Sequence, residues 1–463
     1  MRCCSRRSRV RISIVTLNNV AEYHVESFGC RSSRSDGEAI AAGLRHRGLH
    51  PATDFATANV VVVNTCSVTA EADSGARSFI RRVHRSNPKA KIVVTGCYAQ
   101  RAPQELATIE GVSSVIGNSH KSLVVPSIAP GIAEPSHFIP LATLVNSVPM
   151  YVDKNFAHSE LAALPFAEDA NQTRPNLKVQ DGCANHCSFC IIPETRGPSR
   201  SISLAECLAS VERFVENNGQ ELVLSGINLG RWGRDLQPTQ RFVDLVAAIL
   251  EKTSLPRLRL SSIEPMDWTA ELLSLFSAYP GRLAEHAHLP LQSGSDTILR
   301  RMYRRYRPWH YVEKLGQIRS LLPDAAIGAD VMVGFPGETD SLFQESYDFI
   351  AAQPFTYLHL FPFSARPGTP AAELHRQQPI STVAVERRMA ALRGLAQQKN
   401  LAFRRRFLGR ELSVVTLKGN QPGITPALSD NFIKIEIATL CPPNRTMKVQ
   451  VTRLTETGLF ATL

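Results

Sequence analysis

Three cysteines stand close together in the segment QDGCANHCSFCIIP. Cys183, Cys187 and Cys190 form a CxxxCxxC motif there. Such a loop can place three thiolates around one face of a cubane iron–sulfur cluster and leave one iron open to another molecule. Zinc is the main alternative, but no fourth Cys or His follows at finger-like spacing, although His186 inside the loop is a possible ligand. A metal centre with an open position favours an enzyme.

A second set of three cysteines is spread along the N-terminal part of the chain. Cys30, Cys66 and Cys97 end the segments SFGC, VVVNTC and VVTGC, each of which closes a predicted strand. The carboxyl ends of parallel strands meet at one edge of a sheet, so the three thiols are expected to lie together. A single cysteine after a strand is usually a small buried apolar residue. Three in equivalent places favour a second iron–sulfur cluster that also has only three protein ligands.

The CxxxCxxC motif after a predicted strand resembles the hallmark of the radical S-adenosylmethionine superfamily. Together with the second cysteine set, it makes the sequence similar to the methylthiotransferases of that superfamily, which replace a C–H bond by C–S–CH3. The similarity runs from about Tyr23 to the C-terminus. The motifs that carry it are IIPETRGPSRS (191–201), LSGINLGRWG (224–233), LRLSSIEP (258–265), LPLQSGSD (289–296), DVMVGFPGET (330–339) and FPFSARPGTPAA (361–372).

The resemblance implies two [4Fe-4S] clusters and S-adenosylmethionine as cofactors. S-adenosylmethionine serves as methyl donor to a sulfur held at the second cluster and, after one-electron cleavage, as the source of a 5′-deoxyadenosyl radical. An electron donor of flavodoxin or ferredoxin type and a sulfur donor are the implied partners.

Residues at other strand ends are candidates for binding S-adenosylmethionine or substrate. Ser225 and Gly226 end the second expected barrel strand, where the superfamily contacts the amino group of S-adenosylmethionine. Glu264 follows the third strand and faces the cofactor or pairs with an arginine. Asp330 and Gln292 lie near further strand ends or mouth loops.

Two arginine-rich stretches point to RNA. The segment LRRMYRRYRPW (299–309) interleaves arginines with aromatic residues, which can pair with phosphates and stack on bases. A second concentration of basic residues runs from 387 to 410, although a basic helix face is often simply solvated. The RNA contacts that we expect are Arg300, Arg301, Arg304, Arg305, Arg404 and Arg405. The last segment, through ALSDNFIKIEI (427–437), resembles a TRAM domain, a small RNA-binding β-barrel.

Three methylthiotransferase branches share this layout. Two act on an adenosine beside the tRNA anticodon that carries a threonylcarbamoyl or an isopentenyl group, and the third modifies an aspartate of a ribosomal protein. NTCSVTAEA (64–72) and VTGCYAQR (94–101) look most like the threonylcarbamoyl branch. The isopentenyl branch usually has Arg–Glu after the second cysteine and Met after the third, where this chain has Val68–Thr69 and Tyr98. After Arg31, however, Ser32 and Ser33 replace the customary Val–Asn.

The expected reaction is therefore conversion of N6-threonylcarbamoyladenosine at position 37 of tRNA to its 2-methylthio derivative. The anticodon stem-loop is the expected partner. Methylthiolation of N6-isopentenyladenosine or of a ribosomal aspartate is the enzymatic alternative, and an iron–sulfur RNA-binding sensor is the non-enzymatic one.

Hydrophobic patterns predict the elements that position these residues. Apolar runs at 23–28, 58–63, 91–95 and 112–116 alternate with helical stretches, which predicts an α/β domain with a parallel sheet. Six strand–helix units after Pro175 predict an incomplete (β/α)6 barrel, with a doubly wound open sheet as the alternative.

Four short strands between 411 and 462 predict a small all-β barrel at the end of the chain. The expected divisions are a flexible basic extension (1–20), an N-terminal methylthiotransferase domain (21–133), a linker (134–168), a radical S-adenosylmethionine domain (169–398) and a TRAM-like domain (399–463).

Composition agrees with about three domains at ~150 residues each. The 463 residues include 52 Lys and Arg against 41 Asp and Glu, which gives a net charge of +11, and 43% are hydrophobic. These values exclude a disordered tail, a collagen-like repeat and a small disulfide scaffold. No apolar stretch reaches the ~20 residues of a membrane span and no secretion signal is recognised, so a cytoplasmic location without a membrane partner is expected. The cysteines outside the two sets are expected to be bystanders; they are Cys3, Cys4, Cys207 and Cys441.

Overall fold

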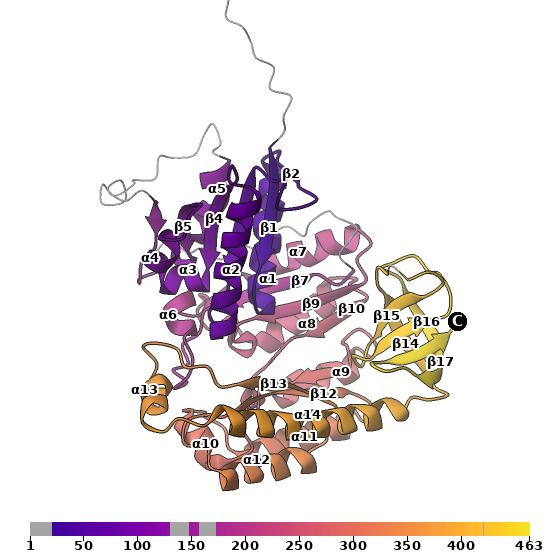
Figure 1. Ribbon diagram of the computed structural model, residues 1–463. Helices are drawn as coiled ribbons and strands as arrows, with labels where there is room; N and C mark the ends of the chain where they lie inside the picture. Colours follow the sequence, from indigo (N-terminus) through magenta and orange to yellow (C-terminus); the bar gives the residue numbers. More distant parts are fainter. Residues whose placement is uncertain (1–20, 130–147, 157–172, 420) are drawn as a thin grey trace, which may run out of the picture.

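The computed structural model describes residues 21–129, 148–156, 173–419 and 421–463. The extension at 1–20, with Cys3 and Cys4, and most of the expected linker lie outside these ranges. The described chain is an α/β structure that consists of an N-terminal parallel sheet, a partial β/α barrel and a C-terminal closed β-barrel (Figure 1). None of the helices in the described ranges combines the length and the apolar composition that a membrane span requires.

The N-terminal domain is a six-stranded parallel sheet in the order β2-β1-β3-β4-β5-β6. Its strands are β1 (Glu22–Ser27), β2 (His50–Pro51), β3 (Val60–Thr65), β4 (Lys91–Gly96), β5 (Val112–Gly117) and β6 (Met150–Tyr151). Its helices are α1 (Arg31–His46), α2 (Ala70–Ser86), α3 (Cys97–Arg101), α4 (Pro103–Ala107), η1 (Asn118–Leu123) and α5 (Val124–Ile128). All four strands expected from the sequence are present within two residues of their predicted limits.

The central strand β3 explains why this sheet is covered on both faces. Its residues VVVVNT are all buried, as in parallel strands packed between helices. Val61 and Val63 pack in one hydrophobic cluster with α2, whereas Val60 and Val62 pack in another with α1. Only three residues separate the end of β1 from the start of α1, so the position of β1 in the sheet also fixes where α1 begins.

The central domain has six parallel strands in the order β7-β9-β10-β11-β12-β13. Two hydrogen-bonded sheets contain them, and isolated parallel bridges between Leu258 and Leu283 and between Ser262 and His288 connect β10 to the β11 side. The parallel strands are β7 (Asn176–Asp181), β9 (Glu221–Gly226), β10 (Arg257–Leu260), β11 (His286–His288), β12 (Ala326–Val333) and β13 (Tyr357–Pro362), and the short antiparallel β8 (Arg200–Ser201) pairs with β7.

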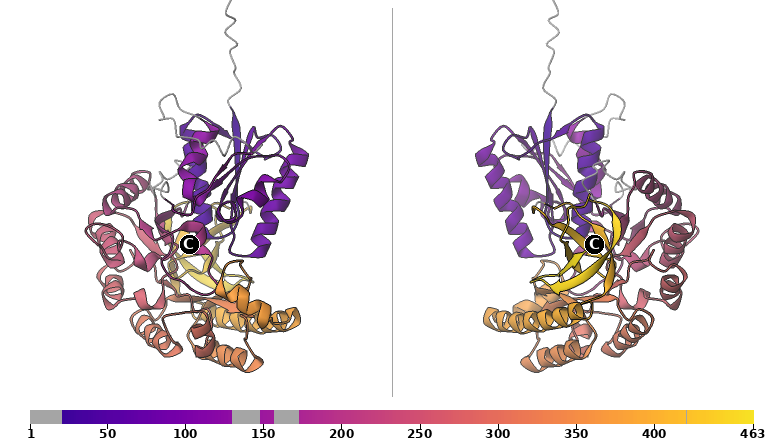
Figure 2. Two further views of the ribbon diagram at one scale, coloured as in Figure 1. Left: turned by 90° about the vertical axis from the view of Figure 1, so that its left-hand side faces the viewer. Right: turned by 90° about the vertical axis from the view of Figure 1, so that its right-hand side faces the viewer.

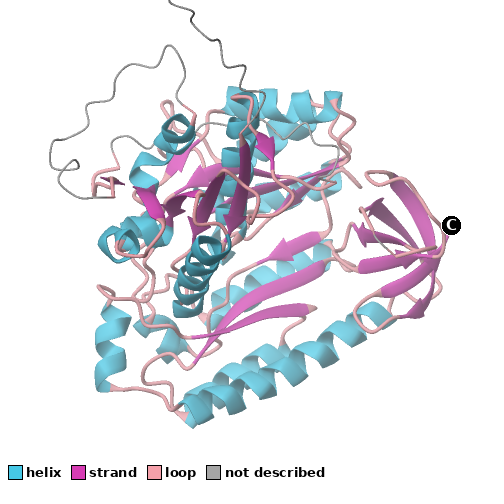
Figure 3. Cartoon of the chain, turned by 45° about the horizontal axis from the view of Figure 1, so that its top comes forward, coloured by secondary structure: helices cyan, strands magenta, loops and turns pink. Residues whose placement is uncertain are grey.

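Helices on the outside of this curved sheet form a crescent, which Figure 2 shows from both sides. They are α6 (Ile192–Arg196), α7 (Leu204–Glu216), η3 (Leu229–Arg231), α8 (Phe242–Lys252), η4 (Pro265–Asp267), α9 (Ala270–Ala278), α10 (Asp296–Arg301), α11 (Pro308–Leu321), α12 (Asp340–Ala352) and α13 (Pro370–Gln377). The incomplete barrel is thus confirmed over the doubly wound alternative. The N-terminal domain lies against this curved sheet, as Figure 3 shows with strands in magenta and helices in cyan.

The long helix α14 (Thr382–Arg405) differs from the expected domain limits. It continues through residues 398 and 399, where the sequence analysis places a boundary. Met389, Leu392 and Leu395 pack in the core of the central domain, whereas Phe403, near the end of the same helix, packs in the core of the C-terminal barrel. One rigid helix therefore belongs to both domains.

The C-terminal barrel has five strands rather than the four expected. They are β14 (Glu411–Thr416), β15 (Thr425–Ser429), β16 (Lys434–Ile437), β17 (Thr446–Leu454) and β18 (Leu459–Thr462), closed in the order β14-β15-β16-β18-β17. The missed strand β15 contains Pro426, a residue that lowers strand expectation because it has no N–H. Within the expected linker (134–168), Met150–Tyr151 forms the edge strand β6 of the N-terminal sheet.

Candidate active site

A cavity of about 580 Å³ lies between the N-terminal domain and the strand ends of the partial barrel. Such a position, outside the carboxyl ends of barrel strands, is where β/α barrels bind ligands. The residues expected to bind cofactor that line it are Cys30, Cys183, Cys187, Cys190, Ser225, Gly226 and Glu264. The structure therefore brings one cysteine of the N-terminal set and all three of the CxxxCxxC set to a single space.

The CxxxCxxC loop starts two residues after β7 and folds back on itself. The Cys183 N–H donates to the Gly197 carbonyl at 3.1 Å, and the Cys190 N–H donates to the Cys187 carbonyl at 3.1 Å. Burial raises the pKa of Cys183, and it raises the pKa of Cys190 to about 12. These thiols therefore stay protonated at neutral pH unless a metal ion or cluster supplies positive charge, which would deprotonate them.

Three N–H donors are directed at the sulfur atoms of this loop. The Asn185 backbone N–H lies 3.4 Å from Cys183 Sγ, the Asn228 Nδ2 lies 3.6 Å from the same sulfur, and an Arg304 Nη1 lies 3.4 Å from Cys187 Sγ. Hydrogen bonds to cluster sulfurs are one of the means by which proteins set the properties of iron–sulfur centres. The donor set therefore fits a [4Fe-4S] cluster held by these three cysteines.

Arg304 and Arg404 correct part of the RNA prediction. Arg304 is buried, donates to Glu264 at 2.7 Å and lies 4.9 Å from the Tyr306 ring centroid, so it belongs to the cavity wall. Arg404 is buried too and donates to the carbonyls of Thr455 and Gly458. Neither guanidinium is on the surface. The exposed members of the expected RNA set are Arg300, Arg301, Arg305 and Arg405.

The three N-terminal cysteines follow three adjacent strands, as expected. Cys30 is the residue before α1, Cys66 follows β3 directly, and Cys97 begins α3 after β4. The thiols of Cys30 and Cys66 are in hydrogen-bonding contact, which lowers the pKa of Cys30 and raises that of Cys66. Gly29 makes this approach possible, because a Cβ there would lie 2.3 Å from Cys66 Sγ.

Polar groups around this second cysteine set also fit an anionic cluster. Asn118 Nδ2 donates to Cys97 Sγ at 3.4 Å and to the Thr195 carbonyl of the central domain at 2.7 Å. The buried Arg196 guanidinium acts electrostatically on Cys30 and Cys97, and its Nε has no hydrogen-bond partner among the described residues. A buried cation with an unused donor beside two of the three thiols fits a negatively charged cluster.

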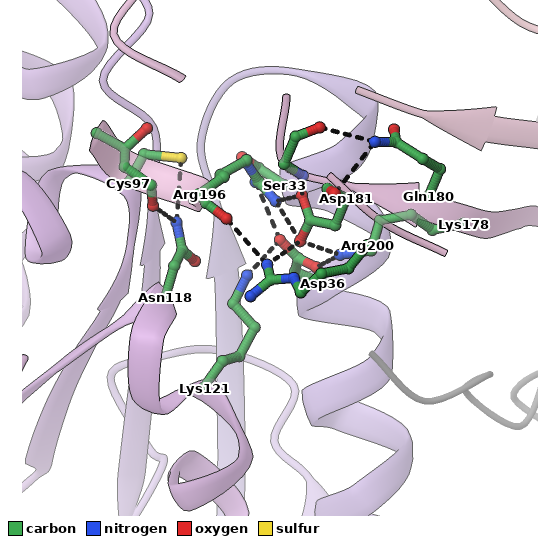
Figure 4. Close-up of polar contacts among 12 residues, drawn as sticks. Ser33, Asp36, Cys97, Asn118, Lys121, Lys178, Gln180, Asp181, Arg196 and Arg200 are labelled. Carbon is green, nitrogen blue, oxygen red and sulfur yellow. Dashed lines mark hydrogen bonds and ion pairs between the residues drawn. The ribbon is translucent and has the colours of Figure 1, made fainter. Parts of the chain in front are cut away.

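An ionic network joins the two domains next to this set (Figure 4). Asp36 of α1 accepts from Lys121 of η1 at 2.6 Å, from Arg196 of α6 at 3.0 Å, and from Lys178 of β7. Arg196 also donates to Asp181, at the end of β7, at 2.9 Å. Burial opposes ionisation of Asp36, but the charges of Lys121, Lys178 and Arg196 outweigh it and hold its pKa well below the usual range. The network therefore fixes α1, which begins directly after Cys30, against β7, which leads to Cys183.

Sequence reasoning missed a histidine pair at the far strand ends. His288 of β11 and His359 of β13 both lie 3.3 Å from the Asp330 carboxylate of β12, and all three line the cavity. Burial opposes ionisation of Asp330, but the nearby His288 imidazole and the hydrogen bond with the His359 imidazole lower its pKa. The sequence analysis singled out Asp330 of this group. The histidines were not singled out, because each lies within a strand and follows no recognised motif.

Comparisons with known proteins place this fold and site in a class. Residues 177–350 match the Radical SAM superfamily, and residues 22–117 match the uncharacterized protein family UPF0004. The structure of the radical S-adenosylmethionine methyltransferase TsrM from Kitasatospora setae is similar, with a TM-score of 0.56 at 15% identity over 77% of this chain and 78% of that chain, which bears on the fold alone. The protein is a radical S-adenosylmethionine enzyme.

Sequence relatives define the family more narrowly. The threonylcarbamoyladenosine tRNA methylthiotransferase MtaB of Bacillus subtilis (strain 168) is 33% identical over 414 residues, 88% of each protein. The tRNA-2-methylthio-N(6)-dimethylallyladenosine synthase of Parafrankia sp. (strain EAN1pec) is 32% identical over 86% of this chain and 78% of its own length. This chain belongs to the methylthiotransferase family, as the sequence motifs predict.

Proposed function

We propose that the protein converts N6-threonylcarbamoyladenosine at position 37 of tRNA into its 2-methylthio derivative. The observation that carries the proposal is the single cavity on which Cys30 and the CxxxCxxC cysteines converge. A methylthio transfer needs the sulfur source and the radical source to reach the same carbon, and one shared cavity between the two cysteine sets satisfies this requirement.

The proposal includes two [4Fe-4S] clusters, one on each cysteine set. When bound, the cluster on the CxxxCxxC loop supplies the electron that cleaves S-adenosylmethionine, and the cluster on Cys30, Cys66 and Cys97 supplies the sulfur. The chain orients these groups through Arg304 and Asn228 at one set and through Asn118 and Arg196 at the other. Ser225, Gly226 and Glu264, on the cavity wall, are proposed to hold S-adenosylmethionine.

Relatives and sequence context support the threonylcarbamoyl substrate over the isopentenyl one. Proteins named threonylcarbamoyladenosine tRNA methylthiotransferase in Bacillus subtilis, Aquifex aeolicus and Rickettsia prowazekii are each 33% identical over 88–92% of this chain. Val68, Thr69 and Tyr98 beside the cysteines agree with that branch. Exposed Arg300, Arg301, Arg305 and Arg405 are proposed to contact the anticodon stem-loop. A reductase of flavodoxin or ferredoxin type, a sulfur donor and a cytoplasmic location complete the proposal.

Nucleoside mass spectrometry of tRNA from a strain that lacks the gene tests the substrate. We expect the 2-methylthio derivative of threonylcarbamoyladenosine to disappear and its precursor to accumulate, with restoration by the wild-type gene but not by Cys187→Ala. Loss of 2-methylthio-isopentenyladenosine instead would assign the chain to the other branch. Unchanged levels of both nucleosides, in a strain without a second enzyme of this family, would contradict the proposal.

A further inference from the structure

The charged side chains that line the cavity are paired, with one exception. Glu264 pairs with Arg304, and Asp330 lies between His288 and His359. Arg31 lines the same cavity, is exposed, and makes no hydrogen bond or ion pair with any residue of the described ranges. Among the residues that the structure describes, no anion neutralises this cationic group of the cavity.

The surroundings of Arg31 are cationic rather than acidic. It is the first residue of α1, a 16-residue helix whose first turn contains no acidic side chain, so the positive end of the helix dipole adds to its charge. Burial and the charges of Arg259, His288 and Arg31 together lower the pKa of His286 on β11. Arg31 lines the same cavity as His288 of β11 and Gln292 just after it, so an anion that enters this cavity would meet an unneutralised cation.

Gln292 gives a second, independent sign of a ligand in this cavity. It lies just after β11, is 7% exposed, and its Oε1 has no hydrogen-bond partner among the described residues. Its backbone has φ of 65°, a left-handed conformation that is unfavourable for a residue with a side chain. A buried carbonyl oxygen without a partner costs free energy, which an N–H donor on a ligand would recover.

We propose that Arg31 binds a carboxylate carried by the N6 substituent of the substrate adenosine, and that Gln292 accepts a hydrogen bond from an N–H of that substituent. This inference rests on the proposed function and specifies how the substituent is recognised. In adenine, N6 and C2 lie on either side of N1 along one edge of the base. A base whose C2 faces Cys30 therefore brings its N6 substituent near the residue that follows Cys30. An isopentenyl group offers neither the anion nor the N–H.

The test uses two anticodon stem-loop RNAs that differ only in the substituent's charge. One carries threonylcarbamoyladenosine, and the other carries its neutral carboxamide. The quantity measured is the ratio of kcat/KM for these two RNAs within each enzyme preparation, so differences in cluster content between preparations cancel. We expect Arg31→Gln to lower kcat/KM for the carboxylate RNA by about 10- to 100-fold, the range of a charge-assisted hydrogen bond.

The same variant is expected to leave kcat/KM for the carboxamide RNA within about threefold, and Arg31→Lys should restore part of the carboxylate preference. Arg34→Gln is the matched control, because Arg34 is an exposed arginine on the same helix that does not line the cavity. Gln292→Leu should lower kcat/KM for both RNAs, because both retain the N–H.

Other outcomes would overturn the assignment. Equal losses on both RNAs would show that Arg31 supports the cluster loop and not the carboxylate. A higher KM for S-adenosylmethionine in RNA-free 5′-deoxyadenosine formation would assign Arg31 to the carboxylate of S-adenosylmethionine, and weaker binding of unmodified RNA would assign it to a phosphate. If the wild-type enzyme converts neither RNA, the proposed function itself fails. If it converts the carboxylate RNA and Arg31→Gln does so with an unchanged kcat/KM, only this inference fails.

Discussion

The Arg304 guanidinium lies between the Cys187 sulfur and the Glu264 carboxylate, 3.4 and 2.7 Å away. In the sequence it stands within an arginine-rich run and looks like its exposed neighbours Arg300 and Arg305. Charge pattern alone does not separate them, because the partners of Arg304 lie 40 and 117 residues away in the chain. A residue that supports the cluster loop and a residue that contacts RNA should respond differently to substitution.

Replacing Arg304 by Lys should impair radical formation and leave RNA binding intact. Lysine keeps the charge but cannot contact both the sulfur and the carboxylate in the same geometry. We expect 5′-deoxyadenosine formation to fall by about 10- to 100-fold, as for other groups that orient metal ligands. The tRNA Kd should stay within about twofold, whereas Arg305→Gln should weaken tRNA binding and spare S-adenosylmethionine cleavage. If Arg304→Lys instead weakens tRNA binding and spares 5′-deoxyadenosine formation, Arg304 contacts RNA and does not support the cluster loop.

The cysteines themselves were predictable because their positions follow from strand ends. The apolar runs before Cys66 and Cys97 fix where β3 and β4 stop, and parallel pairing brings those ends together. The groups that support the thiols were not predictable. Asn118 and Arg196 come from a short 3-10 helix and a five-residue helix, and nothing in their local sequence indicates a sulfur nearby.

At the scale of elements, Glu221 at the start of β9 holds the partial barrel to the C-terminal barrel. This fully buried carboxylate accepts from Arg174 at 2.6 Å and from Arg259 at 2.7 Å. Arg259 also donates to the carbonyls of Ser429 and Asp430, in and after β15. Burial opposes ionisation, but the charges of Arg259 and Arg174 lower the pKa of Glu221 to about 2.

This pKa predicts how acid weakens the contact. The folded-state pKa lies below the unfolded value, so the stabilisation is complete above about pH 4.5 and is lost as the pH falls toward 2. The loss amounts to about 1 kcal/mol by pH 4 and about 2 kcal/mol by pH 3. Urea unfolding of wild type and Glu221→Gln should therefore show a stability difference that narrows from pH 6 to pH 3. A difference that stays constant or widens would contradict the assigned pKa.

The helix α14 shows where reasoning about elements from sequence reached its limit. The helix spans Thr382–Arg405, and nothing in its own sequence shows that its two ends pack in different cores. The packing of the two ends depends on contacts with segments that are far apart in the sequence. The sequence analysis missed β15 for the same reason, because its pairing with β14 and β16 outweighs the poor strand preference of Pro426.

At the scale of the whole molecule, the two cysteine sets are held in fixed relation by the network of Asp36, Lys178, Asp181 and Arg196. Each of these residues comes from an element that begins or ends beside a cysteine loop. The sequence predicted two separate cysteine sets in two domains. It did not predict that they open on the same cavity, because domain orientation depends on buried charges that pair across the interface.

Iron content and turnover of cysteine variants test the central claim most directly. Anaerobically reconstituted wild-type protein should bind about eight irons per chain, cleave S-adenosylmethionine in the presence of a reductant, and methylthiolate threonylcarbamoyladenosine in an anticodon stem-loop. The variant with Cys30, Cys66 and Cys97 changed to Ala should bind about four irons, still form 5′-deoxyadenosine, and make no methylthio product. The variant with Cys183, Cys187 and Cys190 changed to Ala should also bind about four irons, but it should form neither 5′-deoxyadenosine nor the methylthio product. Methylthio product from the first variant, or an unchanged iron content in either, would contradict the account.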